Sequence, residues 1–129
     1  MLSIAGFTGS RSEYGLLKTL FKAFHSAPDI NFQLIVGGSH LSKVHGSTLS
    51  EIESDGLTPS FLLPLSIDSA AEPSMAFACS EAMQGASDIF RKYQPDLLFL
   101  LGDRYETFAV AAAAHLNNIP IVHIHKLSS

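Results

Sequence analysis

The fold is decided by residues 97–125, which read LLFLLGDRYETFAVAAAAHLNNIPIVHIH. The apolar run Leu97 to Leu101 is typical of a strand covered on both faces, as in a parallel sheet. An alanine-rich helix over Tyr105 to Asn117 and another strand over Ile119 to His125 are predicted after it. Ligands of open parallel sheets bind just beyond the carboxyl ends of the strands. The ionisable residues at these two strand ends are therefore candidates for chemistry: Asp103, Arg104, Glu106, His123 and His125.

The residues before this stretch alternate in the same way between strands and helices. Strands are predicted over Leu2 to Thr8, Asn31 to Val36 and Phe61 to Leu65, and helices over Ser10 to Pro28, Ser47 to Asp55 and Ser74 to about Tyr93. Pro64 favours an edge position for the third strand. The alternation implies right-handed βαβ units and hence an α/β fold with a doubly wound parallel sheet.

Helix ends and helix faces give more detailed expectations. Ser10 and Glu13 have the spacing of a capping box, in which each side chain accepts a hydrogen bond from an amide at the helix start. Gly56 and Asn118 are predicted to stop the helices before them. The helix after Ser74 carries one apolar stripe, formed by Met75, Ala78, Ala82, Ala86, Ile89 and Phe90.

The composition excludes several classes of protein. The chain has 129 residues, 47% hydrophobic and 16% charged, which suits one soluble globular domain. Its formal charge of −4 argues against general binding to nucleic acid or to an anionic membrane. The single cysteine, Cys79, excludes an internal disulfide and is expected to be a small core residue. Neither a signal peptide nor an apolar run of the ~20 residues of a membrane span is present, so we expect a cytoplasmic protein.

The loop from Gly6 to Arg11 joins the first strand to the first helix. Free amides at a helix start favour anions, and the Arg11 guanidinium matches phosphate oxygens. The loop fits neither the dinucleotide pattern nor a P-loop. The alternative is a tight turn with an exposed arginine.

Each acidic or basic residue after Leu101 has two interpretations. Asp103 can act as a general acid or base or orient a sugar hydroxyl, or it can be the N-cap of the next helix. Glu106 can be a capping or helix-dipole partner, or a catalyst. Arg104 can hold an anion or pair with Glu106, and the spacing does not decide between these roles.

His123 and His125 are two residues apart on one strand, so their side chains are expected on the same side. A metal site would need further ligands, and none is found at recognisable spacing. The open alternatives are histidines satisfied by the backbone and an acid/base or sugar-contacting role. His40, in the loop after the second strand, is expected to face the same crevice.

Five separated motifs occur in order along the chain. They are TGSRSEYGLL from Thr8, GGSHLS from Gly37, Gly46 and Thr48 followed by Glu51-Ile52 and Asp55-Gly56, GDRYE from Gly102, and HIH from His123. Together they resemble the hydrolysing UDP-N-acetylglucosamine 2-epimerases, including relatives that act on UDP-diacetamido sugars in sialic- and legionaminic-acid synthesis. The match covers essentially residues 2–125.

The resemblance implies a fold and a reaction. The fold is the glycosyltransferase-B arrangement of two Rossmann-like domains, with the active site between them. The reaction removes the proton at sugar C2, releases UDP and hydrates the resulting glycal to the free 2-epimer, without NAD or metal. By the family pattern Arg11 would contact the nucleotide or diphosphate and Asp103 would be an acid/base residue. The further candidates for binding the UDP-sugar are Ser10, His40, Arg104, Glu106 and His123. Family members commonly pair, which leaves a homodimer open.

The chain departs from the family pattern at its end. A family acid/base glutamate falls on His125, and the imidazole can also transfer protons near neutral pH. Residues 126–129 do not resemble the family's Gly-Gly-acidic continuation, and the second family domain is absent. We therefore expect an amino-terminal Rossmann-like domain over residues 1–125 that is inactive alone. The alternatives are a non-catalytic nucleotide-sugar-binding module and a non-functional truncated product.

Overall fold

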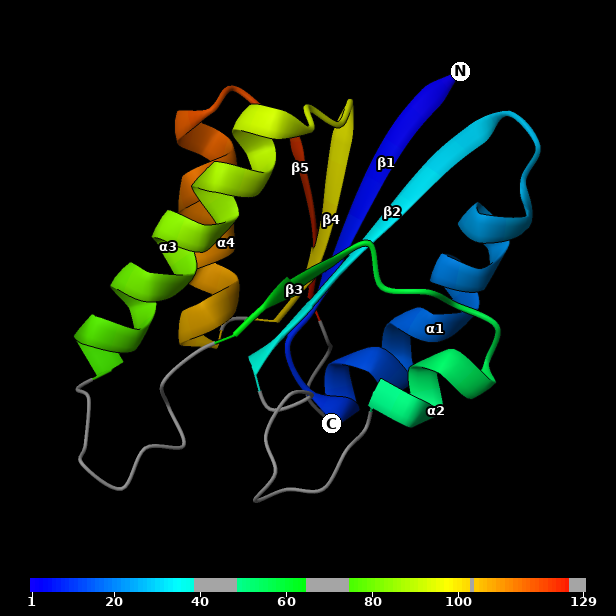
Figure 1. Ribbon diagram of the computed structural model, residues 1–129, viewed down its shortest axis with the longest axis horizontal. Coiled ribbons are helices and arrows are strands. Elements are labelled where there is room, and N and C mark those ends of the chain that lie inside the picture. The colour runs from blue at the N-terminus through cyan, green and yellow to red at the C-terminus, as the bar shows by residue number, and fades with distance from the viewer. Residues whose placement is uncertain (39–48, 65–74, 103, 126–129) are drawn as a thin grey trace.

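Figure 1 shows the computed structural model, in which one parallel sheet lies between two layers of helices. The structure describes residues 1–38, 49–64, 75–102 and 104–125. Its strands are β1 (Leu2–Thr8), β2 (Ile30–Gly37), β3 (Phe61–Leu63), β4 (Leu97–Leu101) and β5 (Ile121–Ile124). Its helices are α1 (Arg11–Ser26), α2 (Leu49–Ser54), α3 (Met75–Lys92) and α4 (Tyr105–Leu116).

The strand order is β3-β2-β1-β4-β5, and all four neighbouring pairs are parallel. This confirms the predicted α/β fold with a doubly wound sheet, and it places β3 at an edge as Pro64 suggested. The chain first winds from β1 outward to β3 and then crosses to the other side of β1 to form β4. The order therefore reverses between β1 and β4, and ligands of such sheets bind at this switch point.

The two faces of the sheet each bury a separate apolar cluster. Helices α1 and α2 cover one face, and α3 and α4 cover the other (Figure 1). Successive residues of β4 alternate between the clusters, with Leu100 packed toward α3 and α4 and Leu101 toward α1. Burial on both faces explains why the strand reads as a continuous apolar run. None of the described helices has the length and apolarity needed to cross a bilayer.

Glycine allows α1 to approach the central strand closely. A Cβ on Gly6 of β1 would lie 2.6 Å from Cε1 of Phe21, which is fully buried.

The predicted helix stops are also confirmed, because Gly56 and Asn118 have φ angles of 87° and 62°.

The strand β5 is shorter than the predicted Ile119 to His125. The Ile119 N–H donates to the Ala114 carbonyl at 2.9 Å, which ties this residue to the end of α4. Pro120 has no N–H to contribute to the sheet. The strand therefore begins after Pro120, and His125 lies just beyond its end.

Other predicted boundaries differ by one or two residues. Strand β2 is one residue longer at each end than predicted, and β3 ends before Pro64. The expected helix starts at Ser47, Thr48 and Ser74 lie outside the described residues. Met75 is wrongly placed in the apolar stripe of α3: it is 60% exposed, one turn before Ala78, the first stripe residue that is buried.

Tyr14 ties α1 to the turn after α2. Its hydroxyl is buried with the side chain and donates to Asp55 Oδ2 at 2.6 Å. This hydrogen bond is the main reason why the pKa of the Asp55 carboxyl lies below its ordinary value. A carboxyl group whose pKa is lowered by folding stabilises the fold above its ordinary pKa, and the contribution disappears as the pH falls through the lowered value.

Replacing Tyr14 by Phe is expected to raise the pKa of Asp55 and to lower the free energy of unfolding at neutral pH. The difference in stability from the wild type should become smaller in acid, as Asp55 is protonated in both proteins. Carboxyl ¹³C titration and urea unfolding at neutral and acidic pH measure both effects. Tyr93→Phe changes a partly buried tyrosine on the other side of the sheet and should leave the pKa of Asp55 unchanged. An equal loss of stability at every pH would contradict the linkage.

Candidate functional site at the switch point of the sheet

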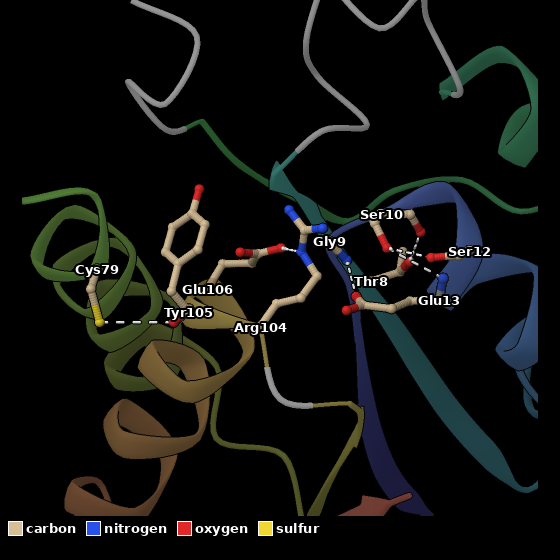
Figure 2. Close-up of polar contacts among 9 residues, drawn as sticks. All are labelled: Thr8, Gly9, Ser10, Ser12, Glu13, Cys79, Arg104, Tyr105 and Glu106. Carbon is tan, nitrogen blue, oxygen red and sulfur yellow. Dashed lines mark hydrogen bonds and ion pairs between the residues drawn. The ribbon is translucent and has the colours of Figure 1, made fainter. Parts of the chain in front are cut away.

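The loops that follow β1 and β4 meet at the carboxyl edge of the sheet, because these strands are parallel neighbours. Figure 2 shows the polar residues of the two loops and of the helix turns behind them. The Arg104 side chain extends between Glu106 on one side and the Gly9 backbone on the other. The site is therefore assembled from segments almost one hundred residues apart in the sequence.

The first loop is held by the predicted pair of Ser10 and Glu13. The Ser10 hydroxyl accepts from the Glu13 N–H at 3.3 Å, which confirms Ser10 as the N-cap of α1. The reciprocal bond differs from the prediction, because Glu13 Oε1 accepts from the Gly9 N–H at 3.0 Å. Both side chains are buried, and their hydrogen bonds hold the loop after β1 against the first turn of α1. The role of Ser10 in ligand binding stays a prediction.

Glu106, in the first turn of α4, is fully buried under both loops. Its Oε1 accepts from Nε of Arg104 at 2.6 Å, so the predicted pairing of these residues is confirmed. The carboxylate also packs against two glycines: a Cβ on Gly9 would lie 3.0 Å from Oε1, and one on Gly38 would lie 3.3 Å from it. Among the described residues, no donor contacts Oε2.

Glu13 makes the corresponding approach from the other helix. A Cβ on Gly102, the residue after β4, would lie 3.6 Å from Glu13 Oε2. Helices α1 and α4 both start at the switch point, and each carries a buried glutamate that lies close to a glycine of the opposite loop. Positive helix N-termini stabilise such carboxylates.

The start of α4 corrects one interpretation. Its N-cap is Arg104, without a capping hydrogen bond from that side chain, so the interpretation of Asp103 as the N-cap is wrong. Arg104 has extended backbone angles and so lies outside the helix, which makes it the N-cap in place of Asp103. Asp103 itself and His40 lie outside the described residues, so their acid/base and ligand-binding roles stay predictions.

The two arginines of the site are held differently. Burial opposes the charge of Arg104, but the hydrogen bond and the charge of Glu106, with that of Glu13, raise the pKa of the guanidinium above its ordinary value. The Arg11 side chain is 76% exposed and pairs loosely with Glu51 of α2, with 3.4 Å between Nε and Oε2. Arg11 thus has the exposed position of the turn interpretation, and its contact with a phosphate stays a prediction.

The two histidines at the end of β5 contact each other, which confirms that they lie on the same side. The ring centroids of His123 and His125 are 4.1 Å apart in a T-shaped arrangement. Nε2 of His123 donates to the Gly102 carbonyl at 2.6 Å, so this histidine is satisfied by the backbone. Within the described part of the chain, no group of three potential ligands is arranged to hold a metal ion.

Two cavities are found among the described residues, and one of them includes Gly102 and His123 of the site. One of about 350 Å³ lies between α4 and the last two strands and is lined by Leu100, Gly102, Thr107, Phe108, Ala111, Ile121 and His123. The other, of about 610 Å³, lies between α3 and α4 and includes Cys79, which is half-buried against the core. Neither contains Arg11 or His125, so the predicted groove shared by Arg11, Asp103 and His125 stays a prediction.

The importance of Gly9, Gly38 and Glu13 for the site was not predicted. The pair Gly37-Gly38 directly after a strand was the available signal, since consecutive glycines often mark a close approach of backbone to other groups. Glu13 was interpreted only as a helix cap.

The fold and the switch-point loops define the class: a Rossmann-like α/β unit of the glycosyltransferase-B type. The sequence profile of the UDP-N-acetylglucosamine 2-epimerase family matches residues 22–126. The chain belongs to this family.

Curated relatives agree with this assignment. The chain is 38% identical over 118 residues to the UDP-N,N'-diacetylbacillosamine 2-epimerase (hydrolyzing) of Legionella pneumophila, covering 92% of the chain and 31% of the relative. It is 31% identical over 124 residues to the UDP-N-acetylglucosamine 2-epimerase of Neisseria meningitidis, covering 96% of the chain and 32% of the relative. The chain therefore spans about a third of the length of these relatives.

Solved structures share the fold at low sequence identity. The Staphylococcus aureus MnaA structure with UDP superposes with a TM-score of 0.81 at 22% identity, over 96% of the chain and 31% of that structure. The Neisseria meningitidis UDP-GlcNAc 2-epimerase bound to UDP-GlcNAc gives a TM-score of 0.76 at 20% identity, over 96% and 32%.

Replacing Gly38 by Ala is expected to lower the free energy of unfolding by about 2–4 kcal/mol, because the new Cβ is strained at φ 59° and would overlap the Gly9 carbonyl oxygen. Gly56→Ala is the matched control, since Gly56 has φ 87° but nothing within 4 Å. It should lose only the backbone term, about 1 kcal/mol. Urea unfolding of both variants measures the difference; equal losses would refute the close contact at the switch point.

Proposed function

We propose that this chain is the amino-terminal Rossmann-like half of a hydrolysing 2-epimerase that acts on a UDP-2-acetamido sugar. The observation that carries the proposal is the 38% identity over 118 residues to a relative of this activity. The exposed histidine pair and the charged Arg104 at the switch point support it, because they lie where ligands of such sheets bind.

The proposed reaction is an elimination followed by a hydration. A base removes the proton from C2 of the sugar while the bond from C1 to the UDP oxygen breaks, which leaves a glycal and UDP. Water then adds its oxygen at C1, and a proton returns to C2 from the opposite face to give the free 2-epimer. UDP leaves and water is added with no net oxidation or reduction, so the reaction needs no NAD; the proposal, like the resemblance, includes no metal ion.

The chemistry requires an acid/base pair and cations at the leaving diphosphate. We assign the acid/base roles to Asp103 and His125. Arg11 and Arg104 are assigned to the diphosphate. The remaining ligand-binding assignments are Ser10, His40 and His123, and Glu106 is assigned to the same site through its ion pair with Arg104.

His123 supports the assignment of its neighbour. Its hydrogen bond to the Gly102 carbonyl joins β5 to the residue just before Asp103. The same ring contacts His125 edge to face. His123 thus limits the movement of His125 and of the start of the loop that carries Asp103, which a proton-transfer pair requires.

The proposal includes a cytoplasmic location and a role in the synthesis of sialic or legionaminic acid. A homodimer is compatible with it. The substrate carries one or two acetamido groups, as the relatives' names allow for each.

The 129-residue chain is expected to bind UDP weakly and to release none from UDP-N-acetylglucosamine. In a two-domain arrangement one domain supplies only one wall of the site. A coupled UDP-release assay tests turnover, with the full-length UDP-N-acetylglucosamine 2-epimerase of Neisseria meningitidis as positive control and Asp103→Asn as the matched variant. NMR titration with UDP tests binding. Release of UDP by the chain above the level of Asp103→Asn would refute the predicted inactivity, and absence of UDP binding would refute the assignment of the site.

A further inference from the structure

Of the two described arginines at the carboxyl edge of the sheet, Arg104 is the one that pairs with a buried acid. Its Nε donates to Glu106 Oε1 at 2.6 Å, and Glu106 is fully buried. The Arg104 side chain is 49% exposed. A guanidinium group has five N–H donors, and this bond uses only the one on Nε.

The terminal nitrogens of Arg104 are therefore available. Among the described residues, they form no hydrogen bond or ion pair. In Figure 2 they point away from β4 and lie near the Gly9 backbone. Two parallel N–H donors in a plane match the oxygens of a phosphate group.

Glu106 holds the Arg104 side chain in this orientation through the hydrogen bond from Nε. Its carboxylate is confined between Gly9 and Gly38, where added Cβ atoms would lie 3.0 and 3.3 Å from Oε1. This close packing and full burial restrict the movement of the carboxylate, and with it the movement of Nε of Arg104. A side chain that is already oriented loses less conformational entropy when a ligand binds.

We propose that Glu106 is a positioning residue: it orients Arg104, which the proposed function assigns to the diphosphate, so that the terminal nitrogens of Arg104 meet the phosphate oxygens of the ligand. The inference rests on the proposed function for the identity of that ligand, a UDP-sugar. Arg11 is 76% exposed and its partner Glu51 is 37% exposed, so no buried acid orients Arg11. Glu106 acts through Arg104 and does not itself touch the ligand.

The first test uses inorganic pyrophosphate, the anionic part of UDP without the nucleoside and sugar. It is titrated into the 129-residue chain at low salt and followed by NMR. Saturable binding is expected at residues around the Gly9 loop. Arg104→Ala should weaken it about tenfold or more, the effect of losing a charged hydrogen bond. Arg91→Ala is the matched control, because Arg91 pairs with Asp88 on the surface of α3. It should change the affinity less than about twofold.

The second test separates orientation from charge at Glu106. Glu106→Met removes a buried negative charge, so an effect through the electric field alone would tighten pyrophosphate binding. Orientation predicts weaker binding, by about threefold to tenfold. Glu106→Gln, which keeps an oxygen acceptor for Nε, should restore most of the affinity. In an Arg104→Ala background, Glu106→Met should cause no further weakening.

Arg104→Lys keeps the positive charge but lacks the planar donors. It tests the role of these donors without any change at Glu106, and therefore also where Glu106→Met does not fold. Binding as weak as that of Arg104→Ala supports the inference. Wild-type affinity in Arg104→Lys, tighter binding in Glu106→Met, or no pyrophosphate binding by the wild type would each overturn it.

Failure of the inference is distinguishable from failure of the proposed function. UDP binding that is unchanged in the Arg104 variants removes the inference and leaves the sugar-nucleotide site. Pyrophosphate binding that depends on Arg104, with UDP-N-acetylglucosamine binding no tighter than pyrophosphate, supports the anion site and removes the sugar-nucleotide assignment.

Discussion

The structure of the site depends on two buried glutamates that meet the glycines of opposite loops at the switch point. Transferring a carboxylate from water to a protein interior costs several kcal/mol, so neither can be buried without compensation. Glu13 is compensated by the Gly9 amide and the start of α1, and Glu106 by Arg104 and the start of α4. The relative placement of the loops after β1 and β4 follows from these contacts.

Glycine is required because the approach is so close. At Gly9 and Gly38 the space of a side chain is occupied by the Glu106 carboxylate or by backbone. The β1 loop, the end of β2 and the first turn of α4 are thus packed against one carboxylate. A substitution at any of these three places displaces the others, which is the behaviour expected of a preorganised binding edge.

The layer architecture could be predicted from the sequence because it depends on local patterns. The apolar run of β4, the cap at Ser10 and the stop at Asn118 each reflect a short-range rule, and each is present in the structure. Predictions failed at element ends, where tertiary contacts decide. Ile119 is withdrawn from β5 by its hydrogen bond to Ala114, and Met75 lies one turn outside the packed part of α3.

The site was predictable in location but not in its contacts. Parallel strands put their carboxyl ends on one edge, so residues after Leu101 and after Ile124 were expected there. The contact of Glu106 with Gly9 joins residues almost one hundred positions apart, and no local pattern encodes it. The sequence leaves two roles open for Arg104, an anion ligand or a partner of Glu106, and the structure shows that they do not exclude each other. Nε of Arg104 pairs with the buried acid, while the side chain is 49% exposed and its terminal nitrogens form no hydrogen bond or ion pair within the described residues, so the two roles are compatible.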